Sequence, residues 1–142
     1  MTFTLHPSLQ AKTVVIDLPL STVLLEDEQH YPWIMLVPRR PHILRMMDLS
    51  LEDQHQLTSE LDCAQHVLWN LFSPTQLNVA AIGNRTPQLH VHVIARHSSD
   101  PAWPATVWDH PVRQPYLVEQ KNLVIAQLTE AFKSIMLDVA TA

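Results

Sequence analysis

The stretch TPQLHVHVIAR, residues Thr86–Arg96, combines a strand pattern with reactive side chains, and the rest of the chain can be interpreted around it. His90 and His92 alternate with apolar residues at every second position, which is the period of a β-strand. The alternation predicts that both imidazoles lie on one face of a strand and the aliphatic side chains on the other. Two residues of strand rise separate the imidazoles by about 7 Å, so both can contact one small substrate.

The spacing of the two histidines alone leaves three interpretations open. Neutral imidazoles two residues apart can share a zinc ion, with His42 or His97 as a third ligand. They can instead act in catalysis as bases or nucleophiles. They can also be polar strand residues without a chemical role.

The heptad Gln88–Ile94, QLHVHVI, resembles the signature of the histidine triad (HIT) superfamily, His-φ-His-φ-His-φ-φ with φ apolar, with glutamine in place of the first histidine. The resemblance extends to the surrounding chain and is close to bacterial members that have Gln at this position. It implies a nucleotide-binding hydrolase or nucleotidyl transferase that acts on an α-phosphate through a covalent nucleotidyl-histidine. His90 would be the nucleophile, His92 its partner on the phosphate side, and Gln88 a supporting residue.

The same resemblance implies substrate-binding residues outside the heptad. Asp27 takes the position of an acidic or amide residue that holds the ribose hydroxyls. Asn84 and Arg85 match an amide and a hydroxyl residue that cradle the phosphate, and Asn78 is a further candidate in the strand before them. Trp103 lies in a Trp-Pro segment like one that closes the pocket in some members.

The composition narrows the class of partner. The chain has 142 residues, of which 46% are apolar, and this is enough for the core of one domain over residues 1–142. The formal net charge is −5 and no run of Lys or Arg occurs, so neither a nucleic acid nor a membrane is expected as a partner. A nucleotide or dinucleotide substrate remains, and the resemblance also implies a homodimer with the two sheets joined edge to edge.

Cysteine and glycine usage excludes several kinds of site. Cys63 is the only cysteine, which excludes an intramolecular disulfide and a cysteine-based zinc cluster, and we interpret it as a packing residue. No apolar run at the N-terminus resembles a signal peptide, which predicts a cytoplasmic location. Gly83 is the only glycine, so no glycine-rich phosphate loop exists. No cofactor or protein-bound metal is required by the expected chemistry.

Hydrophobic patterning predicts an α+β fold, with an antiparallel β-sheet of about five strands, one long helix between strands and a C-terminal helix. The strands are expected at 13–18, 21–25, 33–37, 76–82 and 89–96, the last two as a hairpin. The long helix should begin after the cap residue Ser50, end at Ser73-Pro74, and pack through a stripe from Leu57 to Leu71. The C-terminal helix should pack through Leu117, Leu123, Val124, Leu128, Phe132 and Ile135 and end near Leu137, with the last two residues frayed.

Two other functions compete with catalysis. The same pocket would serve in a non-catalytic module that binds or senses a nucleotide. Alternatively, the chain is a histidine-based metal protein. The roles of His42, His97 and Trp108 stay open at this level.

Overall fold

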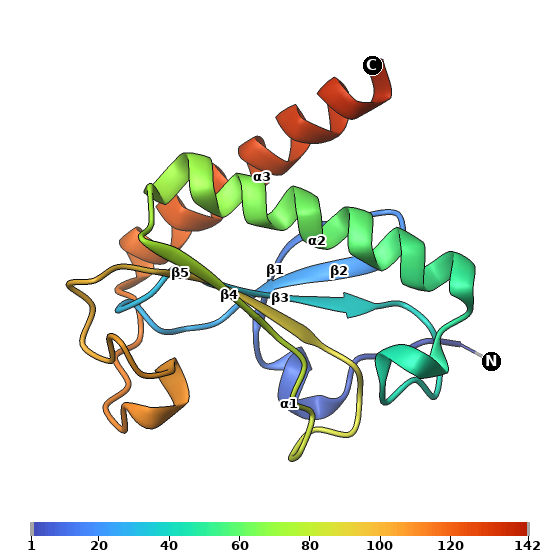
Figure 1. Cartoon of the computed structure of the whole chain (residues 1–142), viewed down its shortest axis with the longest axis horizontal. Coiled ribbons are helices and arrows are strands. Elements are labelled where there is room, and N and C mark those ends of the chain that lie inside the picture. Colours follow the sequence, from blue (N-terminus) through green and yellow to red (C-terminus); the bar gives the residue numbers. More distant parts are fainter. Residues whose placement is uncertain (1, 142) are drawn as a thin grey trace.

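The computed structural model describes the backbone of residues 2–141 and the side chains of residues 2–137. A five-stranded antiparallel sheet in the order β1-β2-β3-β5-β4 forms its centre (Figure 1). The strands are β1 (Thr13–Asp17), β2 (Ser21–Leu25), β3 (Trp33–Pro38), β4 (Gln76–Ala80) and β5 (Val91–Arg96). The predicted α+β class is confirmed, and the predicted strands agree with the observed ones to within two residues at each end.

The sheet consists of two locally connected parts. Strands β1, β2 and β3 follow one another as an antiparallel meander, and β4 and β5 form the predicted hairpin. The two parts join where β3 pairs with β5, with Met35 opposite His92 and Trp33 opposite Ile94. The histidine strand therefore lies inside the sheet, one strand from its edge.

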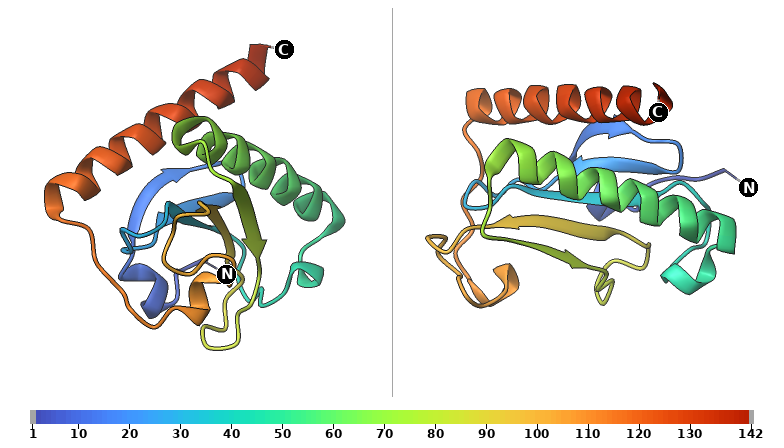
Figure 2. Two further views of the ribbon diagram at one scale, coloured as in Figure 1. Left: turned by 60° about the vertical axis from the view of Figure 1, so that its left-hand side comes forward. Right: turned by 45° about the horizontal axis from the view of Figure 1, so that its top comes forward.

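Helices α2 (Leu51–Phe72) and α3 (Val118–Thr141) cover the same face of the sheet (Figures 1 and 2). Helix α2 begins where predicted, because the Ser50 hydroxyl accepts a hydrogen bond from the Asp53 amide at 3.1 Å. Ala64 and Leu68 of α2 and Phe132 of α3 pack with the aliphatic side chains of the sheet in the largest hydrophobic cluster. None of the described helices is long and apolar enough to cross a membrane.

Two segments without long helices cover the opposite face. The N-terminal segment, residues 2–12 with the short helix α1 (Pro7–Gln10), lies over one part of it, where Leu9 packs against Leu24, Met35 and Val37. The segment 97–113, which contains the 3₁₀ helix η2 (Val107–Asp109), lies over another part and packs on the strand residues Trp33 and Ile94. This second face is the one that carries the two histidines.

Some helical predictions were wrong. Leu71 is 37% exposed, and the buried stripe of α2 passes through Val67. Leu117 and Leu123 are more than 60% exposed, so the C-terminal helix packs mainly through Leu128 and Phe132. Helix α3 also continues past Leu137 to Thr141, while Ala142, expected to fray, lies outside the described residues. A helical period identifies apolar positions, but the neighbours decide which of them are covered.

Glu60 is a buried carboxylate on the packed side of α2, and the sequence analysis did not single it out. It is 3% exposed and accepts hydrogen bonds from the backbone amides of Leu20 at 2.7 Å and Ser21 at 2.9 Å. The side chain of Gln56 donates a third bond at 2.9 Å. Glu60 thus fixes the turn between β1 and β2 to the long helix.

Cys63 is partly buried in α2, where burial, followed by Asp62 and Glu60, raises the pKa of its thiol. A raised pKa keeps the thiol protonated and weakly nucleophilic. This environment agrees with the interpretation of Cys63 as a packing residue.

Candidate functional site

The two histidines occupy the face of β5 that the alternation predicted. His90 and His92 are 9% and 7% exposed, and their ring centroids are 5.0 Å apart. On the opposite face, Val91 packs towards Leu57 of α2, and Val93 belongs to the main core. A well-packed aliphatic row therefore fixes the strand from behind and holds the imidazoles in place.

The protonation of the His90 ring is set by a backbone carbonyl. The Nδ1 atom of His90 lies 2.7 Å from the carbonyl oxygen of Gln88. Because a carbonyl only accepts hydrogen bonds, Nδ1 must carry the proton. In the neutral ring the Nε2 atom then keeps its lone pair, which is the form that a nucleophile or base requires.

The His92 ring is held in the opposite tautomer. The indole Nε1–H of Trp33 donates to Nδ1 of His92 at 3.0 Å, and an indole N–H can only donate. The proton of neutral His92 is therefore on Nε2. Burial, followed by His90 and Lys12, lowers the pKa of His92 to about 3, so the ring is uncharged at neutral pH.

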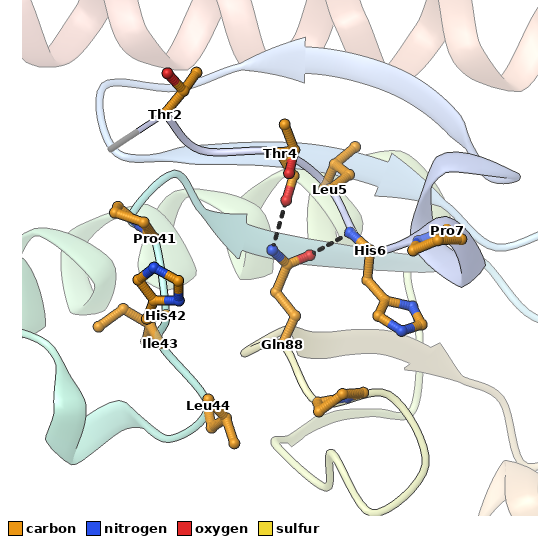
Figure 3. A pocket seen from close by; sticks show the side chains of 11 residues that line it. Thr2, Thr4, Leu5, His6, Pro7, Pro41, His42, Ile43, Leu44 and Gln88 are labelled. Atoms are coloured by element: carbon orange, nitrogen blue, oxygen red, sulfur yellow. Dashed lines mark hydrogen bonds between the residues drawn. The ribbon is translucent and has the colours of Figure 1, made fainter.

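Gln88 fastens the N-terminal segment to the histidine strand (Figure 3). Its side-chain oxygen accepts from the His6 amide at 2.8 Å, and its side-chain nitrogen donates to the Thr4 carbonyl at 2.9 Å. A hollow of about 370 Å³ opens beside it, between this segment and residues 41–44. One residue thus anchors a distant segment through its side chain and fixes the His90 ring through its carbonyl.

A smaller hollow of about 200 Å³ is lined by His90 itself. Its other lining residues include Gly83, whose φ of 62° lies in the left-handed region, and Arg45. Arg45 is an exposed cation, 3.8 Å from Asp48, that sequence reasoning did not single out. Arg45 follows a loop without a sequence motif, so little in the sequence indicates a functional role for it.

The two predicted phosphate-binding residues of the β4–β5 turn, Asn84 and Arg85, are both exposed. Neither of them lines the hollow beside His90, although their neighbour Gly83 does. Their side chains extend from the turn next to that hollow, so their role as phosphate ligands stays a prediction.

Asn78 and Trp103 are grouped around a buried cation. Arg96, 2% exposed, makes two hydrogen bonds to the Asp100 carboxylate at 2.8 and 3.0 Å. It donates a third to the Asn78 side-chain oxygen at 2.9 Å, and its guanidinium lies over the rings of Tyr31 and Trp103. The described contacts of Asn78 and Trp103 are thus with Arg96 and its ion pair, and not with the two histidines.

The tryptophan that contacts the histidine pair is Trp108. Its ring centroid is 5.0 Å from that of His92 and 5.5 Å from that of Trp33, and the side chain is 39% exposed. The guanidinium of Arg113 lies 5.4 Å from the Trp33 ring centre. The segment 107–113 therefore forms an aromatic and cationic wall beside His92. The sequence predicts Trp103 near the pocket and leaves the role of Trp108 open.

The carboxylate of Asp27 is directed to the C-terminal part of the chain. It accepts a hydrogen bond from the Tyr116 amide at 3.0 Å and lies 3.5 Å from the Lys121 ammonium at the start of α3. The neighbouring Glu26 pairs instead with Lys12, whose charge acts on His92. The described contacts of Asp27 are thus with Tyr116 and Lys121, so its role as a ribose ligand stays a prediction.

The third ligands considered for a metal have other environments. The His97 ring bonds to the Phe72 carbonyl at 2.9 Å, away from the pair. His42 has a left-handed backbone with φ of 61° and lines the larger hollow next to Gln88. Among the side chains that the structure describes, no three His, Cys, Asp or Glu come together as a metal site.

Comparison with known proteins places this geometry in context. The family model described as "HIT domain" matches residues 9–99. No curated protein sequence matches the chain. A crystal structure of a histidine triad protein from Bradyrhizobium japonicum shares 37% identity and a TM-score of 0.90, over 93% of this chain and 99% of that one. A histidine triad protein from Marinobacter aquaeolei shares 37% identity and a TM-score of 0.90, over 94% of this chain and 98% of that one.

A more distant structure has a similar fold. The Plasmodium falciparum diadenosine triphosphate hydrolase, solved in complex with cyclomarin A, shares 19% identity with this chain and has a TM-score of 0.59. The match covers 85% of this chain and 76% of that one. At this identity the likeness concerns the fold alone.

Proposed function

Because this chain belongs to the HIT domain family, we propose that it is a nucleotide hydrolase or nucleotidyl transferase that attacks an α-phosphate with His90. The single observation that carries the proposal is the pair of opposite tautomers on β5. His90 exposes an Nε2 lone pair, and the neighbouring His92 exposes an Nε2–H donor. A nucleophile beside a neutral hydrogen-bond donor is an arrangement suited to attack on phosphorus.

The proposed reaction has two displacement steps. The Nε2 lone pair of His90 forms a bond to the α-phosphorus, and the bond from phosphorus to the leaving group breaks with its electron pair. Water then attacks the phosphorus, the nitrogen–phosphorus pair returns to Nε2, and the attacking water loses a proton to solvent. The Gln88 carbonyl holds the Nδ1 proton through both steps. Another acceptor in place of water would make the same reaction a transfer.

In this proposal, protein side chains stabilise the negative charge of the phosphate. His92 donates through Nε2–H to a non-bridging oxygen, and Arg45 contributes positive charge from the rim of the hollow that His90 lines. Asn84 and Arg85 remain candidate phosphate ligands, and Asp27, Asn78 and Trp103 remain candidate substrate contacts from the family resemblance. The hydrolase from Plasmodium falciparum indicates dinucleoside polyphosphates as one substrate class to test.

The proposal also covers the branch of the family, the domain organisation, the assembly and the location. Within the family we place the chain in the bacterial branch with glutamine at the first signature position, as one HIT-like domain over residues 1–142. A homodimer, a cytoplasmic location, and partners limited to nucleotides rather than nucleic acid or membranes stay predictions.

Trapping of the covalent intermediate tests the proposal directly. The protein is mixed with adenosine or guanosine phosphoramidates or with dinucleoside polyphosphates, quenched rapidly, and weighed intact by mass spectrometry. A mass increase of one nucleotide, located on His90 by peptide mapping, is the expected result. Nucleotide binding without an adduct and without turnover would instead identify a non-catalytic binding module.

Gln88 provides a prediction about the departure from the three-histidine signature. The two ring nitrogens of an imidazole point in different directions, so histidine at this position cannot make both bonds that the planar amide makes to Thr4 and His6. We expect Gln88→His and Gln88→Ala each to lower the free energy of unfolding by about 1–2 kcal/mol, measured by urea denaturation. Turnover of Gln88→His should stay within about tenfold of the natural chain, a barrier change of about 1.4 kcal/mol.

Substrates with good and poor leaving groups serve as the control for Gln88. If proton relay at this position limits the reaction, Gln88→His will accelerate turnover by far more than tenfold, and most for poor leaving groups. Such a gain would refute the view that Gln88 is only a supporting residue and that two histidines suffice.

A chelator separates the proposed chemistry from the metal alternative. Among the described side chains no three His, Cys, Asp or Glu come together as a metal site, and the His97 ring bonds to a backbone carbonyl. We therefore expect activity and Tm to be unchanged, within about 1 °C in Tm, after treatment with a strong chelator and dialysis. Loss of both, with recovery on adding zinc, would favour the metal interpretation.

A further inference from the structure

We propose that Trp33 is a positioning residue that holds His92 as a neutral N–H donor, and that the site therefore acts on nucleotides whose leaving group departs without taking up a proton. This inference rests on the proposed function and deepens it by naming the substrate class. It selects phosphoanhydrides, whose leaving phosphate is a stable anion, over phosphoramidates of alkyl amines.

Trp33 fixes the tautomer of the His92 ring. Its indole N–H occupies Nδ1 of His92 at 3.0 Å, and the bond is buried. An imidazole takes up its second proton at the unprotonated nitrogen, which here is Nδ1. The Nδ1 lone pair already accepts the hydrogen bond from the Trp33 indole, which can donate a proton but cannot accept one. His92 can therefore offer the Nε2–H bond to a substrate oxygen but cannot store an additional proton for release.

The packing around Trp33 keeps this arrangement rigid. The indole is 3% exposed, and its ring centre lies 5.5 Å from that of Trp108 and 5.4 Å from the Arg113 guanidinium. On β5 its partner across the strands is Ile94, which is fully buried. The donor is thus directed at His92 by a buried aromatic side chain on a neighbouring strand.

The charged groups near His92 favour the same neutral state. Lys12 comes from the end of the N-terminal segment and is paired with Glu26, Arg113 lies over the Trp33 ring, and His90 is the next imidazole on the strand. Burial is the largest cause that lowers the pKa of His92, and His90 and Lys12 add to it. A protonated His92 would add a further positive charge beside Lys12 and Arg113 at a buried position.

The consequence for the leaving group follows from proton balance. When His90 attacks phosphorus, the bond to the leaving group breaks heterolytically, and the departing atom carries the electron pair. A phosphate oxygen leaves as an anion without further help, whereas an alkyl amine must be protonated as it leaves. General acid catalysis typically contributes about 10² to 10⁴ in rate, and His92 in this tautomer does not supply it.

The test compares two substrates and two tryptophan variants. Adduct formation on His90 is timed by rapid quench with a dinucleoside polyphosphate and with an adenosine phosphoramidate of an alkyl amine. We expect the anhydride to react at least about a hundredfold faster. Trp33→Phe keeps the aromatic bulk but removes the donor, and Trp69→Phe on the outer side of α2, where Trp69 is 50% exposed, is the matched control.

Nitrogen-15 spectra of the histidine rings show whether Trp33 acts through the His92 tautomer. In the natural chain and in Trp69→Phe, Nδ1 of His92 should be unprotonated and Nε2 protonated. In Trp33→Phe the two tautomers should become mixed, and kcat should fall about tenfold with KM changed less than about threefold. A merely structural role for Trp33 would leave the tautomer of the folded protein unaltered.

Three results would overturn the inference. They are an Nδ1 proton on His92 in the natural chain, an unchanged tautomer in Trp33→Phe, or equal rates for the two leaving groups. Absence of an adduct from both substrates would refute the proposed function and the leaving-group selection with it. The spectra are recorded without nucleotide, so they judge the bond between Trp33 and His92 independently of that outcome.

Discussion

The His90→Ala protein is expected to bind nucleotides nearly as tightly as the natural chain while its turnover falls by at least about a thousandfold. Removing the imidazole deletes the atom that forms the bond to phosphorus, whereas most contacts to the bound substrate come from other groups. Binding is measured by calorimetry with a non-hydrolysable nucleotide, and turnover by release of the mononucleotide. The adduct seen by mass spectrometry should disappear in the same variant.

His66→Ala is the matched control for this experiment. His66 lies on α2 with a side chain that is 60% exposed, and its ring contacts Asp62. The control should keep both binding and turnover. Near-normal turnover in His90→Ala would remove His90 from the role of nucleophile.

The largest expected loss of stability concerns Glu60. In Glu60→Ala the backbone amides of Leu20 and Ser21 lose their shared acceptor inside the protein. Each buried amide without a partner costs about 1–3 kcal/mol, so the free energy of unfolding should fall by about 3–4 kcal/mol in urea or thermal denaturation. This is a large part of the total for a domain of ordinary stability.

Two further substitutions serve as comparisons for Glu60→Ala. Glu60→Gln keeps one acceptor oxygen but turns an amide nitrogen towards a backbone N–H, so its loss should be intermediate. Glu130→Ala, at an exposed position within α3, should change stability by less than about 0.5 kcal/mol. A loss below about 1 kcal/mol in Glu60→Ala would mean that the turn finds another acceptor.

Local patterns in the sequence predicted the elements that depend on local physics. The alternation around His90 and His92 determined which face each side chain occupies, because a strand offers only two faces. Ser50 marked the start of α2, because its hydroxyl caps a free amide within the same turn. The hairpin of β4 and β5 followed from two strand patterns separated by a short turn.

No local sequence pattern predicts the contacts between distant parts of the chain. The N-terminal segment has no period, and its position depends on a glutamine more than 80 residues away that bonds to Thr4 and His6. Glu60 interrupts an apolar stripe, and only the fold shows that the backbone amides of Leu20 and Ser21 lie within hydrogen-bond distance of its carboxylate. Of the two candidate tryptophans, the choice of Trp103 over Trp108 for the pocket had no physical basis until the path of the segment after β5 was known.

The joining of two strand groups within one sheet has a consequence for folding. The meander of residues 13–38 and the hairpin of residues 76–96 each consist of contacts close in sequence, which form quickly. The bond from Trp33 to His92 spans 59 residues and exists only after the two groups have docked through β3 and β5. The strands can therefore form before the bond from Trp33 to His92 that completes the site. Loss of the pairing between β3 and β5 would break the bond from Trp33 to His92, so the tautomer of His92 depends on this one strand pair.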